Sequence, residues 1–482
     1  MTASLGGLFL DAMVWSEWGF LIYLFILSSL YFFLVMVGLV EMLRHRATGG
    51  RVEDSGALNS SLLVPPVSVL APAYNEAVTI RESVKALLAL SYPEHEVIVI
   101  NDGSTDQTLQ LLIEEFHLYR SARYSGEGLK TKPVRAIYES MDPIRLIVVD
   151  KENGGKADAL NAGINAAKYP LICSVDADSL LEQDALIRIA RRFLLDPERV
   201  LAVGGIVRIA NGCATASGRV IDVNLPRSWL ARFQVVEYLR AFLGGRVAFS
   251  TSNCLLVVSG AFGLFKKWAV LAAGGYDPRT VGEDMELIVR LHRWARERKM
   301  DYRIVFQPDP VCWTEAPESL RVLKKQRNRW QRGTIETLWK HRAMVARPGY
   351  GLLGFLALPC FVLFEGLGPL VESAGYVITA LGLSLGIFAP RIAILFFIAA
   401  VVNGIVLSGA CVVLGELSTR RYPRVSNVLS LLVAAVGENF GFRQLLTLWR
   451  AQAFWDLWKG KKSWGTMERT GFSRASYEMD RI

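Results

Sequence analysis

Long apolar stretches lie near both ends of this chain of 482 residues and flank a region of mixed polarity. Residues 20–40 contain no charged side chain and reach the roughly 20 residues that a helix needs to cross a bilayer. Residues 392–416 predict a second crossing. The pattern therefore predicts membrane helices on either side of a globular region at residues 44–346.

The first apolar stretch predicts an uncleaved membrane anchor at residues 17–43, between an N-terminal segment at 1–16 and a linker at 44–65. A cleaved signal peptide is the alternative, but its apolar core is shorter and its basic residues precede that core. Here Arg44 and Arg46 follow the apolar stretch, which predicts a cytoplasmic position for its C-terminal end.

The second apolar region, at residues 351–416, is harder to divide into spans. Glu365 and Glu372 interrupt its first half, and charges at membrane depth are functional candidates, with placement at a helix end as the alternative. We expect a kinked or partly re-entrant segment near these two residues, then one crossing, then the span at 392–416. Residues 417–482 are expected in the cytoplasm or at the membrane interface.

Short apolar runs alternate with helical patterns from residue 66 to residue 316, and turn or polar residues bound each run. Strands interleaved with helices predict a mostly parallel sheet covered on both faces, in which ligands bind at the carboxyl ends of the strands. The expected fold class is therefore α/β, with strands at residues 67–72, 97–101, 145–150 and 170–175.

A basic amphipathic pattern occupies residues 317–346, directly after this domain. Leucine, isoleucine and tryptophan recur at roughly helical spacing among lysines and arginines, which is typical of helices in the membrane interface. We therefore expect interfacial helices between the globular domain and the second apolar region.

Composition and charge narrow the class of protein. The apolar fraction of 52% favours a membrane protein, whereas the net charge of +9 also fits a nucleic-acid binder. The basic residues gather beside the apolar stretches and no nucleic-acid module is visible, so we expect no nucleic-acid partner. The six cysteines lack metal-binding spacing and indicate reduced thiols in a cytosolic domain.

Two polar motifs follow successive predicted strands. Tyr74 and Glu76 lie in the first, PAYNE, and Asp102 lies in the second, NDGSTD. A carboxylate at a strand end can accept hydrogen bonds from a pyrimidine base or a ribose, and Tyr74 can cover the base. A turn that leads into a helix N-cap explains NDGSTD equally well when that motif is taken alone.

The next two motifs carry a cation and two carboxylates. Lys156 follows two glycines in NGGKADALN, so the backbone can approach an anion while the ammonium binds a phosphate. Asp176 and Asp178 end the strand at 170–175, and such carboxylates repel unless a cation lies near them. Hard oxygen ligands favour Mg²⁺ or Mn²⁺, which neutralise a diphosphate leaving group. An ordinary loop is the alternative for each motif alone.

Glu283 and Asp284 begin a helical pattern in the motif GED. Acidic residues at a helix N-terminus stabilise the helix through its dipole, which is one interpretation. The other is that Asp284 acts as a base and removes a proton from an acceptor hydroxyl.

Gln326, Arg329 and Trp330 share one face of the predicted basic helix, because they are spaced by three and four residues. Arg329 can bind a departing diphosphate, and Trp330 can stack on a sugar ring. An arginine and a tryptophan that anchor the helix in the membrane interface are the alternative, and composition alone favours it.

The ordered set of motifs resembles the processive family-2 glycosyltransferases, which include the cellulose, hyaluronan and chitin synthases. PAYNE, NDGSTD, NGGKADALN, DAD, SGAFGLFKK, GED and QRNRW occur in the family's order across residues 71–333. The GGKADALN spelling is most similar to that of the poly-β-1,6-N-acetylglucosamine synthases, although GED stands where many of them have TED. The resemblance implies a cytoplasmic, Rossmann-like GT-A domain inserted between transmembrane helices, and it favours sugar transfer over anchoring.

The resemblance also implies a role for each site residue. Asp178, with Asp176, would bind Mg²⁺ or Mn²⁺, and Asp284, beside Glu283, would be the base of an inverting transfer. The substrate-binding residues would be Tyr74, Glu76 and Asp102 on the uridine, Lys156 and Asp176 near the diphosphate, Ser259 and Gly260 around the sugar, and Gln326, Arg329 and Trp330 on the diphosphate and the acceptor.

We therefore expect a hexosyltransferase that uses UDP-N-acetylglucosamine or UDP-glucose to extend a β-linked exopolysaccharide and to pass it through the bacterial inner membrane. Its expected partners are the UDP-sugar donor, a growing glycan or lipid acceptor, the lipid bilayer and accessory export subunits. Transfer of a single sugar to a lipid carrier is the nearest alternative. An inactive membrane scaffold of an export complex is the other.

Overall fold

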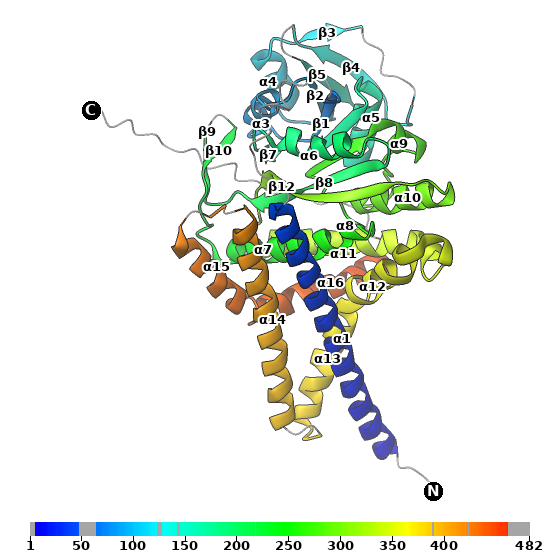
Figure 1. Ribbon diagram of the computed structural model, residues 1–482, viewed down its shortest axis with the longest axis vertical. Helices are drawn as coiled ribbons and strands as arrows, with labels where there is room; N and C mark the ends of the chain where they lie inside the picture. Colours follow the sequence, from blue (N-terminus) through cyan, green and yellow to red (C-terminus); the bar gives the residue numbers. More distant parts are fainter. Residues whose placement is uncertain are drawn as a thin grey trace, which may run out of the picture.

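The computed structural model describes residues 5–47, 64–122, 128–141, 145–216, 218–387, 390–419, 421–422 and 424–460. An α/β domain lies above a layer of helices, and long apolar helices extend away from that layer (Figure 1). Most of the predicted linker at 44–65, and residues 461–482 of the expected C-terminal segment, lie outside the described residues.

A ten-stranded sheet with the order β3-β4-β5-β2-β1-β6-β11-β8-β12-β7 forms the centre of the α/β domain. The parallel strands β1, β2, β5 and β6 are almost entirely buried, as strands covered on both faces are. The strands are β1 Val67–Ala73, β2 His95–Asp102, β3 Tyr119–Ser121, β4 Val134–Glu139, β5 Leu146–Lys151, β6 Leu171–Val175, β7 Leu180–Leu181, β8 Val200–Ile209, β11 Phe262–Lys266 and β12 Arg303–Thr314, while β9 Ala214–Ala216 and β10 Arg219–Asp222 form a separate pair.

The sheet is mixed, so the prediction of a mostly parallel sheet is wrong. β4 pairs antiparallel with β5, and β11 lies antiparallel between β6 and β8. The chain passes beneath the sheet before it reaches β11, so that strand runs in the opposite direction to β6. Because Phe262 pairs with Val175, the residues that precede β11 lie next to those that follow β6.

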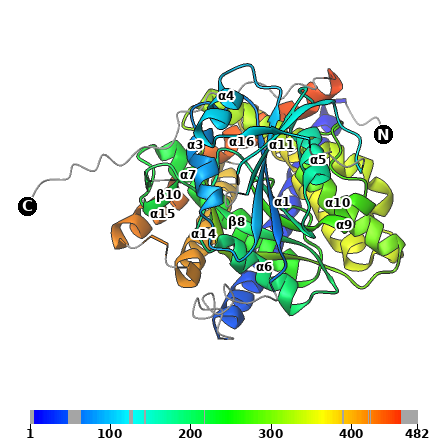
Figure 2. The same ribbon diagram turned by 90° about the horizontal axis from the view of Figure 1, so that it is seen from above.

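Helices cover both faces of the sheet, with α3 on one side and α5, α9 and α10 on the other (Figure 2). In α3 the residues Ile80, Val84 and Leu87 are buried, and their spacing of four and three places them on one apolar face. These helices are α3 Ile80–Leu88, α4 Thr108–Glu115, α5 Lys156–Ala166, α6 Ala185–Leu195, α9 Lys267–Ala272 and α10 Glu283–Glu297.

A layer of helices separates the sheet from the apolar helices (Figure 1). It contains α7 Trp229–Leu239, the π-helix η2 Arg240–Arg246, α8 Val247–Thr251 and α11 Leu320–Lys340. The basic stretch predicted to be helical at 317–346 contains α11. Arg327 and Arg332 of this helix are buried, at 2% and 5% exposure, whereas Trp339 is 69% exposed. The location of the helix in the membrane interface stays a prediction.

The apolar helices include two that are long and apolar enough to cross a membrane, and up to four spans if each of two bent pairs counts as one, within the described part of the chain. The single helices contain Met13–Arg44 and Ala400–Leu417. The helices are α1 Leu5–Ala47, η5 Leu353–Ala357, α12 Leu358–Cys360, η6 Phe361–Gly366, α13 Gly368–Ser384, α14 Pro390–Thr419, α15 Val425–Gly437 and α16 Phe442–Trp458.

The first bent pair changes direction by 43° between Gly366 and Gly368, inside the stretch where the sequence predicts a kink. The second pair, α15 and α16, bends by 59°. α16 packs against α11 and α13, so the C-terminal helices contact both the layer beneath the sheet and the apolar helices.

Candidate active site

Two loops at the carboxyl ends of β1 and β2 interlock through Asn75. This residue has a left-handed backbone (φ 56°), and its side-chain oxygen accepts a hydrogen bond from the backbone N–H of Thr105 at 2.8 Å. Glu76 is buried and accepts a hydrogen bond from the Thr79 hydroxyl at 3.0 Å, whereas Tyr74 is 49% exposed. The PAYNE and NDGSTD motifs therefore form one continuous surface.

Asp102 holds the glycine loop that begins α5. Its carboxylate accepts hydrogen bonds from the backbone N–H groups of Gly154 (3.0 Å) and Gly155 (2.7 Å), and it pairs with Lys151 at 2.7 Å. Lys151 is fully buried and also lies 2.6 Å from Asp158. The sequence interpretation omitted Lys151, although the register that pairs β2 with β5 places it directly beside Asp102.

Lys156, the first residue of α5, faces two carboxylates. Its Nζ forms an ion pair with Asp176 and lies 3.8 Å from Glu283 Oε1. Burial opposes ionisation, but these two carboxylates raise the pKa of Lys156 above its ordinary value, so the ammonium stays charged. Gly260 lies against this cluster, because a Cβ at that position would meet Lys156 Nζ at 2.9 Å.

Asp284 and Glu283 have different environments at the start of α10. Asp284 accepts backbone hydrogen bonds from Gly260 at 3.1 Å and from Met285 at 2.8 Å, and these fix its carboxylate beside the predicted sugar pocket. Glu283 is only 5% exposed, and burial raises its pKa to about 7, with Lys156 opposing that rise. The pair thus combines a fixed carboxylate with a group that titrates near neutrality.

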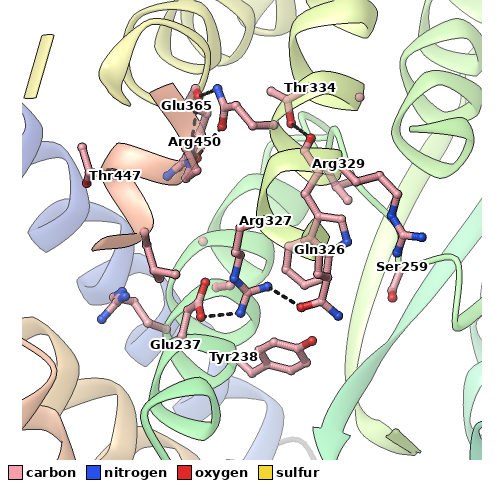
Figure 3. A pocket seen from close by; sticks show the side chains of 18 of the residues that line it. Glu237, Tyr238, Ser259, Gln326, Arg327, Arg329, Thr334, Glu365, Thr447 and Arg450 are labelled. Atoms are coloured by element: carbon pink, nitrogen blue, oxygen red, sulfur yellow. Dashed lines mark hydrogen bonds and ion pairs between the residues drawn. The ribbon is translucent and has the colours of Figure 1, made fainter. Parts of the chain in front are cut away.

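Gln326, Arg329 and Trp330 reach the same region from α11. Figure 3 shows the Arg329 side chain directed toward Ser259, which precedes β11. Burial lowers the pKa of Arg329 and the nearby Glu283 partly offsets that effect, so α11 adds a second cation to the site. Trp330 is 43% exposed, which leaves its ring accessible to a ligand.

The sequence pattern does not mark Arg327 as a site residue, because Arg327 lies off the helix face that Gln326 and Arg329 share with Trp330. It pairs with Glu237 of α7 at 2.6 Å and donates to Gln326 Oε1 at 3.2 Å (Figure 3). Its guanidinium also lies 4.2 Å from the centroid of the Trp330 ring. Arg327 therefore orients both Gln326 and Trp330.

Every site residue predicted from the sequence lines one cavity of about 2690 Å³. The same cavity continues between the apolar helices, where Phe20 and Tyr31 of α1, Tyr376 of α13 and Arg450 of α16 line it. In Figure 3 the Arg329 side chain lies toward the sheet and Arg450 lies toward the apolar helices. The structure thus joins the predicted catalytic residues to the predicted membrane region.

Asp176 and Asp178 suit a divalent cation that is shared with phosphate groups. No cluster of three or more histidine, cysteine, aspartate or glutamate side chains that could hold a metal occurs among the residues described. Mg²⁺ usually keeps several waters and binds through one or two carboxylates plus substrate phosphates. The two aspartates therefore fit a cation site that a nucleotide diphosphate would complete.

The chain belongs to the glycosyltransferase-like family 2, because the model of that family matches residues 65–333. It is a glycosyltransferase whose sheet domain has a GT-A-like mixed sheet. A mannosyltransferase, PcManGT from Pyrobaculum calidifontis, solved in complex with GDP-Man and Mn²⁺, has a similar fold with a TM-score of 0.52. That likeness covers 88% of this chain and 99% of the mannosyltransferase at 21% identity.

Among curated relatives, the chain is similar to poly-beta-1,6-N-acetyl-D-glucosamine synthases of Staphylococcus. It is 33% identical over 273 residues to the synthase of Staphylococcus aureus strain COL, an alignment that covers 56% of this chain and 55% of the relative. The synthase of Staphylococcus epidermidis is 32% identical over 276 residues, with 57% and 56% covered. The chain therefore spans about half the length of the curated relatives it matches.

Proposed function

We propose that this glycosyltransferase is an inverting, metal-dependent enzyme that uses UDP-N-acetylglucosamine or UDP-glucose to extend a β-linked polysaccharide. One observation carries the proposal: a single cavity joins the strand-end residues to the apolar helices. The matched relatives are N-acetylglucosamine polymer synthases, which favours UDP-N-acetylglucosamine as the donor.

The donor would lie across the carboxyl ends of β1, β2 and β6. Tyr74, Glu76 and Asp102 would bind the uridine, since all three line the cavity at the end of β1 or β2. Lys156 and Arg329 would bind the diphosphate from opposite elements, α5 and α11. Both cations lie near the carboxylates of the site, and each can donate charged hydrogen bonds to phosphate oxygens.

Asp176 and Asp178 would hold Mg²⁺ or Mn²⁺ next to that diphosphate. A bound divalent cation supplies charge neutralisation as the diphosphate leaves. The solved mannosyltransferase with a similar fold contains Mn²⁺, which supports dependence on a divalent cation.

Asp284 would act as the base. It would remove the proton from an acceptor hydroxyl, whose oxygen would attack the anomeric carbon of the donor sugar opposite the diphosphate. The bond between that carbon and the diphosphate oxygen would break, UDP would depart, and the α-linked donor would give a β-linked product. Trp330 would stack on the acceptor sugar, and Gln326 would lie beside it at the mouth of the helical part of the cavity.

The apolar helices would hold the enzyme in the bacterial inner membrane with the sheet domain in the cytoplasm. The growing glycan would leave the site through the part of the cavity lined by α1, α13 and α14. Accessory export subunits would receive the polymer beyond the membrane.

A donor screen tests this function directly. Purified protein is incubated with UDP-glucose, UDP-N-acetylglucosamine or UDP-glucuronate, with and without EDTA, and UDP release and product length are measured. We expect UDP-N-acetylglucosamine or UDP-glucose to give EDTA-sensitive UDP release and a long product. Short lipid-soluble product alone would indicate single transfer, and no UDP release with any donor would indicate a scaffold.

The base assignment is tested by Asp284→Asn. We expect transfer to fall by about 10²-fold or more while UDP binding is kept, because the amide cannot accept the proton. Asp301→Asn is the matched control, since Asp301 is 79% exposed and lies outside the cavity. Turnover near the wild-type rate in the Asp284 variant would refute the assignment.

A further inference from the structure

One wall of the cavity is a row of aromatic rings with an arginine at each end. The Trp330 and Tyr238 ring centroids are 6.4 Å apart, and those of Tyr238 and Phe242 are 5.9 Å apart. Arg327 lies 4.2 Å from the Trp330 centroid, and Arg246 lies 3.9 Å from the Phe242 centroid. All five side chains line the cavity.

The two arginines differ in their partners. Arg327 pairs with Glu237 and also donates to Gln326. The Nη1 atom of Arg246 is buried and has no hydrogen-bond partner among the described residues. A buried guanidinium donor without a partner costs free energy unless a ligand or water satisfies it.

Arg246 ends the π-helix η2, and π-helical turns are frequent at functional sites. This helix packs against α1 and α14, whereas Lys156 and Asp176 approach the cavity from α5 and β6. Arg246 therefore comes from an element that packs against the apolar helices, whereas Lys156 and Asp176 come from the sheet domain.

The charges around Arg246 place it near the proposed base. Burial lowers the pKa of Arg246 to about 10, and the carboxylate of Asp284 and the hydroxyl of Tyr238 oppose that effect. The side chain thus remains a cation at neutral pH.

We propose that Arg246 is an acceptor-binding residue, which donates from its Nη1 atom to the terminal sugar of the glycan while that sugar stacks on the aromatic row. The inference rests on the proposed function and assigns a residue to its acceptor. Rings such as Trp330 and Tyr238 fix the plane of a sugar but not its rotation. A directional donor at the end of the row fixes that rotation and turns one hydroxyl toward Asp284.

The test separates acceptor binding from donor binding. Arg246→Gln and Arg246→Lys are purified as full-length protein and assayed with UDP-N-acetylglucosamine and a β-1,6-linked N-acetylglucosamine tetrasaccharide. We expect the KM for the tetrasaccharide to rise about 10- to 100-fold in Arg246→Gln and less in Arg246→Lys, because a charged hydrogen bond is lost in the first and partly kept in the second. The Kd for UDP should stay unchanged.

Arg298→Gln is the matched control, since Arg298 is an exposed arginine 5.0 Å from the Trp294 ring and lies outside the cavity. An unchanged tetrasaccharide KM in Arg246→Gln would overturn the inference, and so would an equal loss of UDP affinity. If the glutamine variant melts at a lower temperature than the wild type, the lysine variant decides. Absence of transfer by the wild-type protein would instead refute the proposed function.

Discussion

At the scale of single residues, several charged side chains of the site form ion pairs with one another and so fix one another's positions. Lys151 illustrates this, because it is fully buried and touches two carboxylates, Asp102 at 2.7 Å and Asp158 at 2.6 Å. Asp102 in turn fixes the loop before Lys156. The fold therefore depends on a cation that the motifs do not mark as functional.

Replacing that cation should destabilise the sheet domain. Lys151→Met leaves Asp102 and Asp158 buried without their shared partner, and the expected loss of stability is about 3–5 kcal/mol. The variant should melt at a clearly lower temperature, and its UDP affinity should fall because the loop before Lys156 loses its anchor. Lys130→Met, which alters an exposed lysine, should behave as the wild type. Equal melting of both variants would contradict a structural role for Lys151.

Glu283 should make both stability and transfer depend on pH. Its pKa is raised from the ordinary 4.5 to about 7, mainly by burial, while Lys156 and Arg329 favour the charged form and Asp284 opposes it. Because the pKa of Glu283 is higher in the folded protein, its neutral form contributes to stability. That contribution is complete below about pH 4.5 and is lost as the pH rises through about 7.

Glu283→Gln removes this titration. At about pH 8.5 the variant should melt roughly 2–4 °C above the wild type, and this difference should shrink at about pH 5.5. A step near neutrality in the rate of UDP release should also disappear. A difference in melting temperature that is equal at both pH values would show that Glu283 does not titrate in this range.

At the scale of elements, the start of α10 crosses α11 at two glycines. A Cβ on Gly333 would lie 2.7 Å from Gly282 Cα, which is closer than real contacts allow. The crossing sets the distance between Asp284 on one helix and Trp330 on the other. Neither Gly282 nor Gly333 carries a side chain, so the two backbones approach closely at this contact.

Gly333→Ala should therefore separate the two helices and misplace the proposed base relative to the acceptor. We expect kcat to fall by about 10²-fold, since a displacement of about 1 Å in an active site has effects of that size. The Kd for UDP should change much less, because the proposed donor site lies at the strand ends. Gly349→Ala is the control, as a Cβ there meets no atom within 4 Å. Normal turnover in Gly333→Ala would show that the crossing tolerates a methyl group.

The elements that sequence predicted best are those with a simple local pattern. The strands β1, β2, β5 and β6 are continuous buried runs, and the polar motifs lie at their ends as predicted. The antiparallel strand β11 was not among the strands predicted, and its direction depends on the path of distant helices and not on local residues. For the same reason Arg327 and Lys151 were missed, since their partners Glu237 and Asp102 come from other elements.

At the scale of the whole molecule, a polar network joins the sheet domain to the apolar helices. Arg450 of α16 donates to Gln331 of α11 at 2.7 Å and pairs with Glu365 of η6 at 2.8 Å. The Tyr31 hydroxyl of α1 donates to the same Glu365 carboxylate at 2.6 Å. Gln331 directly follows Trp330, so the helix that carries the proposed acceptor-binding residues is connected to three other helices.

A double-mutant cycle on Arg450 and Glu365 tests whether this network couples the two regions. Arg450→Gln leaves the Glu365 carboxylate without its cation, and Glu365→Gln leaves the arginine without its anion. Each single variant should therefore melt at a lower temperature. The double variant should lose less free energy of unfolding than the two single variants lose together, by about 1–3 kcal/mol. All three should release UDP yet make shorter polymer, because α11 loses its connection to the helices that line the exit.

The exposed pair Arg293 and Glu297, 2.8 Å apart on α10, gives the matched control cycle, which should show coupling of at most about 0.5 kcal/mol. Additive effects at Arg450 and Glu365, with polymer of normal length, would mean that transfer does not depend on this link.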